Sequence, residues 1–183
     1  MRRLTGLALV TLALLAVFAA APAAQAQEAG EQAFEIYGGY YVPGIDDLDN
    51  DITYGIRYGS RPNDQFGWRI GAGYFDLNQN NTDLSLFIGS ADAWLIDLDG
   101  IWYIGGSDFG LFASVGWATV NIDISGSTRD ESDDAFQYGG GALYHFNFGD
   151  RYVVTPQVRL RRFEGDIYEK TDEEYTLSFG WRY

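Results

Sequence analysis

The chain ends on a nine-residue segment, YTLSFGWRY, that spans residues 175–183. Its odd-numbered positions carry large apolar side chains: Tyr175, Leu177, Phe179, Trp181 and Tyr183. Its even-numbered positions carry small or polar ones: Thr176, Ser178, Gly180 and Arg182. A period of two places these sets on opposite faces of an extended chain, whereas a helix would mix them. The segment therefore predicts a β-strand with one apolar and one polar face.

Seven upstream segments repeat this alternation. Together with the last segment they predict eight strands, whose ends carry a margin of about 2 to 4 residues. The predicted spans are 33–42, 51–60, 65–76, 91–104, 109–119, 136–146, 152–162 and 174–183. The alternation slips near Val120, which predicts a β-bulge at that position.

The connections between these strands alternate in length. Residues 61–64, 105–108 and 147–151 form short turns, whereas residues 43–50, 77–91, 120–135 and 163–173 form longer connections. Short and long connections are therefore expected at opposite ends of the molecule. An antiparallel up-and-down barrel with an even number of strands, and with both termini at the short-turn end, produces this pattern.

The alternation alone leaves two barrels open, because a soluble lipocalin-like ligand-binding barrel is apolar inside and a membrane barrel is apolar outside. The polar face here combines glycines with arginines, and Lys170 is the only lysine of the sequence. Small residues beside large ones fill a narrow interior. Aromatic residues also gather near both ends of the apolar face, as they do at membrane interfaces. The sequence thus favours an all-β fold, an eight-stranded transmembrane β-barrel, and keeps the lipocalin-like barrel as the alternative.

The N-terminus has the features of a cleavable signal peptide. Arg2 and Arg3 precede an apolar run over residues 4–20, and Ala24 and Ala26 form a small-residue cleavage site. The predicted division is a signal peptide over residues 1–26 and a barrel domain over residues 27–183. With no cysteine, neither a disulfide nor a lipidated cysteine can anchor the chain. The mature part has 10 basic and 26 acidic residues, a net charge of −16, which argues against nucleic acid as a partner.

The last strand, with its alternate aromatics and terminal Tyr183, resembles the assembly signal of outer-membrane β-barrel proteins. The residues that carry this resemblance are Tyr175, Leu177, Phe179, Trp181 and Tyr183. With the signal peptide and the loop pattern, the chain is similar to the small OmpA-, OmpX- and opacity-type barrels of the Gram-negative cell envelope. This resemblance implies an outer-membrane location, contact with lipid and lipopolysaccharide, and insertion by the barrel assembly machinery.

Eight charged residues share the predicted inner face. They are Glu35, Arg57, Arg69, Asp97, Asp99, Arg159, Arg161 and Arg182. In a narrow barrel such charges need partners, so we expect a salt-bridged plug in which Glu35 lies between Arg57 and Arg182, and Arg69 lies beside Asp99. The alternative is a narrow porin-like channel through an arginine-lined lumen.

Catalysis is the least favoured class. His145 is the only histidine, and it lacks the His-x-Ser arrangement of lipid A deacylases. No serine lies beside it in the sequence to complete a nucleophile, base and orienting group. A lipid-modifying enzyme therefore ranks last, and the sequence assigns no catalytic residue and no cofactor.

Acidic residues concentrate in the long connections, which hold 14 of the 16 net negative charges. Divalent cations could link such carboxylates to one another or to lipopolysaccharide phosphates. Asp46, Asp47, Asp49 and Asp51 are the candidate ligands, although Ile52 occupies the position where an EF-hand needs glycine. A solvated, self-repelling rim is the plainer interpretation. The function predicted is a structural or surface-interaction role through acidic extracellular loops.

Overall fold

The computed structural model describes residues 30–44, 51–76, 90–123, 130–164 and 171–183. These ranges contain nine β-strands and one short 3-10 turn, η1 (Ile104–Gly106). The strands are β1 (Glu31–Val42), β2 (Asp51–Arg61), β3 (Phe66–Asp76), β4 (Ser90–Tyr103), β5 (Phe109–Asp123), β6 (Asp130–Tyr144), β7 (Phe146–Phe148), β8 (Tyr152–Glu164) and β9 (Thr171–Arg182).

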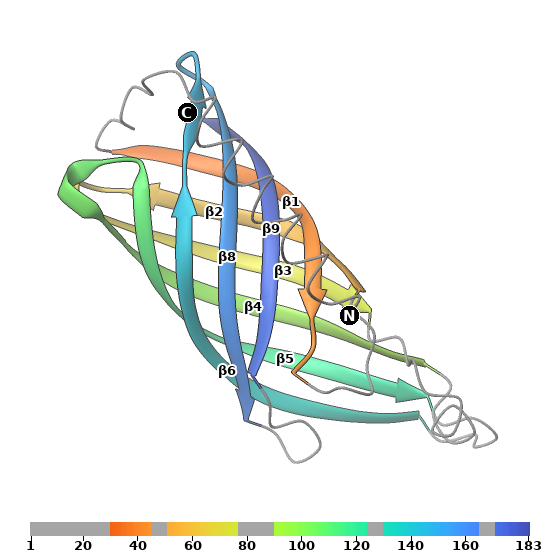
Figure 1. Ribbon diagram of the computed structural model, residues 1–183. Helices are drawn as coiled ribbons and strands as arrows, with labels where there is room; N and C mark the ends of the chain where they lie inside the picture. Colours follow the sequence, from red (N-terminus) through yellow and green to blue (C-terminus); the bar gives the residue numbers. More distant parts are fainter. Residues whose placement is uncertain (1–29, 45–50, 77–89, 124–129, 165–170) are drawn as a thin grey trace, which may run out of the picture.

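The strands form one closed antiparallel barrel. Each of β1 to β5 pairs with the next, β9 pairs with both β1 and β8, and β6 and β7 both pair with β8, which closes the sheet (Figure 1). The pairs Leu143↔Gln157 and Phe146↔Val154 keep one register along β8, so β6 and β7 together form one long barrel strand. Between them lies Pro156, which has no amide hydrogen for the ladder. With β6 and β7 counted as one, the barrel therefore has eight strands, and the predicted eight-stranded antiparallel fold is confirmed.

Most predicted strand ends agree with the structure to within three residues, but the hairpin of β5 and β6 is longer than expected. Its ladder runs unbroken from Phe109↔Tyr144 to Asp123↔Asp130. The predicted bulge at Val120 is therefore wrong. Val120 points inward like Ala118, and both belong to an apolar cluster inside the barrel. The prediction expected polar or small residues on the inner face, so an inward apolar residue was interpreted as a slip in the alternation.

The two faces of the barrel have opposite chemistry. Outward side chains such as Ile36, Trp94 and Leu177 are more than half exposed, whereas polar side chains on the other face are buried. This arrangement is the reverse of a lipocalin-like barrel, so that alternative is excluded. Aromatic pairs lie near both ends of the outer face: Tyr54–Tyr74 and Tyr74–Trp94 at one end, and Tyr58–Trp68 and Tyr152–Trp181 at the other.

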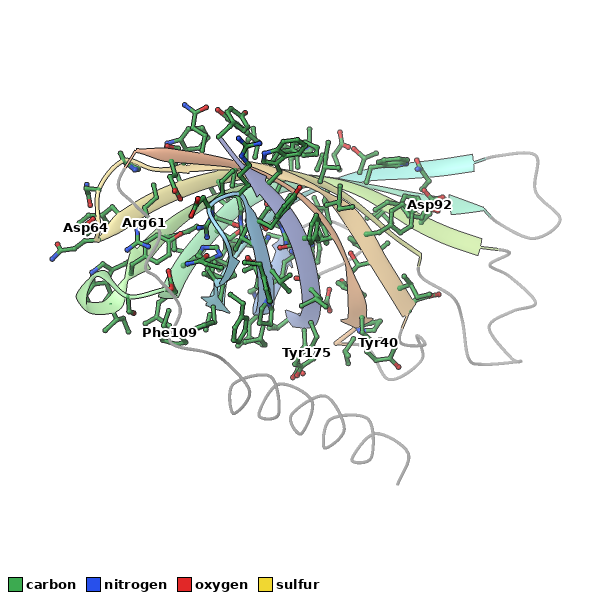
Figure 2. The ribbon with its side chains drawn as sticks, turned by 90° about the horizontal axis from the view of Figure 1, so that it is seen from above. Tyr40, Arg61, Asp64, Asp92, Phe109 and Tyr175 are labelled. Carbon is green, nitrogen blue, oxygen red and sulfur yellow. The ribbon has the colours of Figure 1, made fainter. Side chains whose placement is uncertain are left out.

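The three short connections, 62–65, 104–108 and 149–151, lie at one end of the barrel, which we call the short-turn end. The opposite end is the long-loop end. Figure 2 shows Arg61 and Asp64 at the short-turn end, and Tyr40 and Asp92 toward the other. No helix in the described ranges is long and apolar enough to cross a membrane.

The interior is layered along the barrel axis. At the long-loop end an apolar layer contains Tyr41, Phe75, Ala93, Leu95, Ala118, Val120, Ala135 and Phe163. Near the short-turn end a second apolar group contains Ile101, Tyr103, Phe112 and Leu143. Between them lies a polar middle layer that holds most of the buried charges, and this layer is the candidate site.

Candidate functional site

The space for the interior charges comes from glycines on neighbouring strands. The register places Arg57 opposite Gly71, Arg69 opposite Gly59, and Arg159 opposite Gly141. A Cβ atom at Gly71 would lie 2.7 Å from Asp97 Oδ1 and 3.3 Å from Arg57 Cγ. A small residue thus stands beside each long one, which is how a narrow eight-stranded barrel fills its interior.

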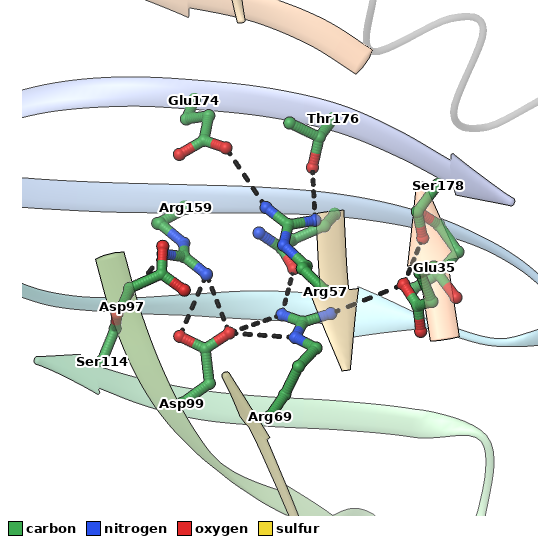
Figure 3. A network of polar contacts seen from close by, with 12 residues as sticks. Glu35, Arg57, Arg69, Asp97, Asp99, Ser114, Arg159, Glu174, Thr176 and Ser178 are labelled. Carbon is green, nitrogen blue, oxygen red and sulfur yellow. Dashed lines mark hydrogen bonds and ion pairs between the residues drawn. The ribbon is translucent and has the colours of Figure 1, made fainter. Parts of the chain in front are cut away.

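Eight of the buried charged residues form one unbroken chain of ion pairs in which acid and base alternate. We call it the interior ion-pair chain, and Figure 3 shows the part of it around Arg69, Asp99 and Arg159. Its members, in order of contact, are Glu35, Arg69, Asp99, Arg159, Asp97, Arg161, Glu174 and Arg57. The N···O distances along the chain are 3.9, 2.7, 2.8, 2.7, 3.3, 2.8 and 3.3 Å. Six of the eight barrel strands contribute to it: β1, β2, β3, β4, β8 and β9.

Arg159 lies at the centre of the interior ion-pair chain and is fully buried. Its Nη1 donates to Asp97 Oδ2 at 2.7 Å, and its Nη2 donates to Asp99 Oδ1 and Oδ2 at 3.0 and 2.8 Å. Asp99 Oδ2 also accepts from Arg69 Nε and Nη2 at 3.0 and 2.7 Å. Such fork-shaped, charge-assisted contacts fix the geometry of both partners.

The buried charges balance within the described residues. Six arginines are buried: Arg57, Arg61, Arg69, Arg159, Arg161 and Arg182. Six carboxylates are buried: Glu35, Asp97, Asp99, Asp108, Asp172 and Glu174. Taking ions out of water costs several kcal/mol each, and close opposite charges offset that cost. Removing one member would leave its partners buried with less compensating charge.

The structure places all eight charged residues predicted for the lumen inside the barrel. Seven of them belong to the interior ion-pair chain, and Arg182 lies apart at the short-turn end. Arg69 pairs with Asp99 across neighbouring strands at 2.7 Å. Glu35 differs from expectation: it is level with Arg57 in the β1–β2 register, yet its carboxylate contacts Arg69 at 3.9 Å and accepts from the Ser178 hydroxyl.

Four buried charged residues were missed from the sequence: Glu174, Asp172, Arg61 and Asp108. Glu174 and Asp172 had been counted with the outer loops, but β9 begins at Thr171 and carries both inward. Asp172 accepts from Tyr41 Oη and from the backbone N–H of Gly44, the latter at 2.6 Å. The inward positions of Thr176 and Ser178 were the available signal, because the same alternation reaches residues 174 and 172.

At the short-turn end Arg61 connects two turns. Its Nη2 donates to the carbonyl oxygens of Asp64 at 2.5 Å and Gly106 at 3.0 Å. Its guanidinium lies 3.9 Å from the ring centroid of Tyr103, a cation–π contact. Arg182 pairs with Glu31 at 3.6 Å. Arginines therefore close this end of the barrel as well.

His145 is held inside the barrel by two hydroxyl groups. Its Nε2 lies 3.0 Å from Tyr103 Oη, and its Nδ1 lies 2.8 Å from Thr155 Oγ1. A hydroxyl beside an imidazole is the minimum for a nucleophile and its base. Thr155, however, is only 1 % exposed, and the adjoining cavity measures about 20 Å³. That space admits no lipid, so the geometry supports a structural role for His145.

The remaining sequence candidates lie on the surface or outside the described ranges. Leu177, Phe179, Trp181 and Tyr183 of the C-terminal signal are exposed on the outer face, and Tyr175 of the same face is half-buried. Asp51 begins β2, where its Oδ1 accepts from the backbone N–H of Ile52 at 2.6 Å. Asp46, Asp47 and Asp49 lie outside the described residues, as does the predicted signal peptide. Within the part that the structure describes, no group of three or more acidic, His or Cys side chains is arranged to hold a metal ion.

Comparison with known proteins gives a family and a set of similar folds. The model of the family described as outer membrane protein beta-barrel domain matches residues 10–183. The structure is similar to Ail, the attachment invasion locus protein of Yersinia pestis, with 14% identity, a TM-score of 0.60, and coverage of 85% of this chain and 99% of that one. Neisserial surface protein A follows with 14% identity, a TM-score of 0.55, and coverage of 84% and 96%.

A third similar structure is the N-terminal β-barrel domain of Pseudomonas aeruginosa OprF. Its identity is 17%, its TM-score is 0.52, and the coverage is 86% of this chain and 100% of that one. Among curated proteins no sequence matches the chain. At these identities the structural likeness concerns the fold alone.

Proposed function

We propose that this chain, which belongs to the family of outer membrane protein beta-barrel domains, is a non-conducting barrel that acts at the cell surface through an acidic rim. It is an integral outer-membrane barrel protein. The observation that carries the proposal is the interior ion-pair chain, whose four arginines and four carboxylates fill the middle layer. Because the buried charges cancel, the net negative charge of the protein is carried outside the lumen.

Two further features support a closed interior. The Tyr41 and Phe75 rings stack 4.4 Å apart, and Phe163 packs against Phe75 at 6.2 Å, which places an apolar layer above the charges. Arg61 and Arg182 occupy the short-turn end below them. A hydrated ion would have to displace both the apolar layer and at least one buried ion pair. These contacts disfavour the narrow porin-like channel, and the small space around His145 disfavours a lipid-modifying enzyme.

The acidic rim begins directly beyond the aromatic residues of the long-loop end. Four outward carboxylates, which we call the rim carboxylates, occupy this level: Asp92, Asp134, Glu164 and Glu173. Glu164 Oε1 accepts from Tyr138 Oη at 3.0 Å, and Glu173 Oε2 accepts from Tyr175 Oη at 2.6 Å. With Asp172 and Glu174 inside the barrel, the long connections and their flanks retain 12 of the 14 net negative charges counted from the sequence.

The rim carboxylates suit divalent cations that bridge to lipopolysaccharide phosphates. In barrels of this kind the aromatic girdles lie at the membrane interfaces and the long loops are extracellular. Carboxylates one step beyond the outer girdle would then stand at the level of the lipid phosphates, with Ca²⁺ or Mg²⁺ as the bridging ion. Ail has been crystallised with the heparin analogue sucrose octasulfate. A polyanion of that kind does not suit this rim without a bridging cation.

The test compares stability with and without calcium in lipid vesicles that contain lipopolysaccharide. The rim variant carries Asp92→Asn, Asp134→Asn, Glu164→Gln and Glu173→Gln. Its control, Asp64→Asn with Asp150→Asn, removes exposed acids at the short-turn end. Millimolar Ca²⁺ should raise the unfolding midpoint of the wild type and of the control, and EDTA should reverse the rise. The rim variant should lose most of it. An equal calcium response in the rim variant, or none in the wild type, would contradict the proposal.

The proposal includes the route to the membrane. Cleavage after Ala26 releases a chain that starts at Gln27. The outward side chains near the C-terminus, Tyr175, Leu177, Phe179, Trp181 and Tyr183, then serve as the signal for the barrel assembly machinery.

A further inference from the structure

A small cavity with a mixed polar and apolar lining lies inside the barrel at the short-turn end. Its volume is about 20 Å³. Its lining includes Glu35, Arg61, Arg69, His145 and Arg182, with Tyr103 on one side. A cavity needs about 10–15 Å³ to admit a water-sized species, so this one has room for a single small occupant.

The arginines that line this cavity keep buried donors without a hydrogen-bond acceptor among the described residues. These donors are Arg61 Nε and Nη1, Arg69 Nη1, and Arg182 Nε. Arg61 Nη1 lies 3.9 Å from Asp108 Oδ1, and Arg69 Nη1 lies 3.9 Å from Glu35 Oε2. Both separations are too long for a hydrogen bond. All three arginine side chains are at least nine-tenths buried, so bulk water cannot satisfy them.

The unmatched atoms on the cavity wall are all donors. A water molecule there could accept only two hydrogen bonds, whereas four guanidinium donors are unmatched. An anion accepts from every side and donates nothing. The donors belong to three guanidinium groups, each of which already has a carboxylate within 4 Å: Asp108 for Arg61, Asp99 for Arg69 and Glu31 for Arg182. The excess of unmatched donors, and not an excess of charge, therefore favours an anion over water.

We propose that this cavity binds a monatomic halide, chloride in the cell, held by Arg61, Arg69 and Arg182. A monatomic ion is the smallest anion that can accept from several donors, so a space of this size favours it over sulfate, phosphate or a carboxylate. The bound ion would satisfy donors on β2, β3 and β9 at once, and so would lock the short-turn end of the barrel. The site is independent of the acidic rim, since it lies at the opposite end and binds the opposite charge.

The test uses the folded, full-length mature protein in detergent micelles. Its thermal midpoint is measured in sodium chloride, sodium bromide and sodium gluconate at equal ionic strength, which keeps charge screening constant. Chloride and bromide should raise the midpoint by about 3 °C or more over gluconate. Arg182→Gln should lose this difference. Arg151→Gln, which changes an exposed arginine at the same end, should keep it.

A second measurement uses only the wild type, in case Arg182→Gln fails to fold. Crystals grown in sodium bromide should give an anomalous peak between the three guanidinium groups. A midpoint that is the same in all three salts overturns the proposal, as does a halide effect that persists in Arg182→Gln. A bromide crystal with no anomalous peak in the cavity overturns it too, because the cavity would then hold water alone.

Discussion

Replacing Asp99 by asparagine is predicted to destabilise the barrel by about 3 kcal/mol. Asp99 is fully buried and is the shared acceptor of two arginines. Its carboxylate receives two hydrogen bonds from Arg69 and two from Arg159 Nη2. Asparagine keeps one acceptor oxygen, but its amide group turns donors toward guanidinium groups that can only donate.

The size of the effect follows from what each arginine retains. Breaking a buried pair by removing one partner costs about 3–5 kcal/mol. Arg159 keeps Asp97 at 2.7 Å, and Arg69 keeps Glu35 at 3.9 Å together with its hydrogen bond to Gln157 Oε1 at 2.5 Å. The lower end of the range therefore applies. With a urea dependence of about 2 kcal/mol per molar, a loss of 3 kcal/mol lowers the unfolding midpoint by about 1.5 M.

The assay is urea unfolding of the protein in lipid vesicles, followed by tryptophan fluorescence. Glu164→Gln is the matched control, because it removes an exposed carboxylate that accepts a single hydrogen bond from Tyr138. Its midpoint should stay within about 0.3 M of the wild type, since exposed sites contribute about 0.5 kcal/mol or less. If Asp99→Asn shifts the midpoint no more than Glu164→Gln does, the reasoning about the interior ion-pair chain is refuted.

Three further predictions concern other parts of the chain. Gly73→Ala would bring its Cβ into overlap with Tyr37 Oη, so it should cost about 1–3 kcal/mol in urea unfolding. The same change in a Tyr37→Phe background should cost far less; equal costs would contradict this packing. His145→Ala leaves the Tyr103 and Thr155 hydroxyls without their buried partner, and should lower stability by about 1–3 kcal/mol in the same assay. Intact mass of protein taken from outer membranes should correspond to residues 27–183, and a mass that includes residues 1–26 would contradict the signal peptide.

The strands and their facing could be predicted because both depend on local alternation. Each strand of a barrel with an apolar outside repeats one pattern, and Tyr175 to Tyr183 display it completely. The pairing of Arg69 with Asp99 was also predicted, because the two residues lie at similar heights on adjacent antiparallel strands. Contacts between neighbouring strands are therefore within the reach of sequence reasoning.

The contacts across the lumen could not be predicted in the same way. Arg159 meets Asp99 although 60 positions separate them, and Arg57 meets Glu174 across the barrel interior. Such pairs depend on the tilt and stagger of the strands, which a local pattern does not specify. Arg61 was missed for a different reason: it lies at a predicted turn, where an inward side chain cannot be told from an exposed one.

Val120 shows why the layered interior led to the wrong prediction of a β-bulge. The rule used for the lumen expected polar or small residues inside, whereas the long-loop end has an apolar inner layer that includes Val120 and Phe163. An inward apolar residue then resembles a residue out of phase. The register of β5 with β6, which has no interruption, resolves the ambiguity.

The most direct test of a closed, charge-balanced interior is ion conductance in planar lipid bilayers. Insertion is verified separately by the heat-dependent gel migration of the reconstituted protein. The wild type should give no current above the lipid baseline, whereas a variant in which Arg69, Asp99 and Arg159 are all serine should give discrete steps. Stepwise conductance in the wild type at ordinary voltages would contradict the central claim, because ions would then pass an interior that the ion-pair chain is expected to close.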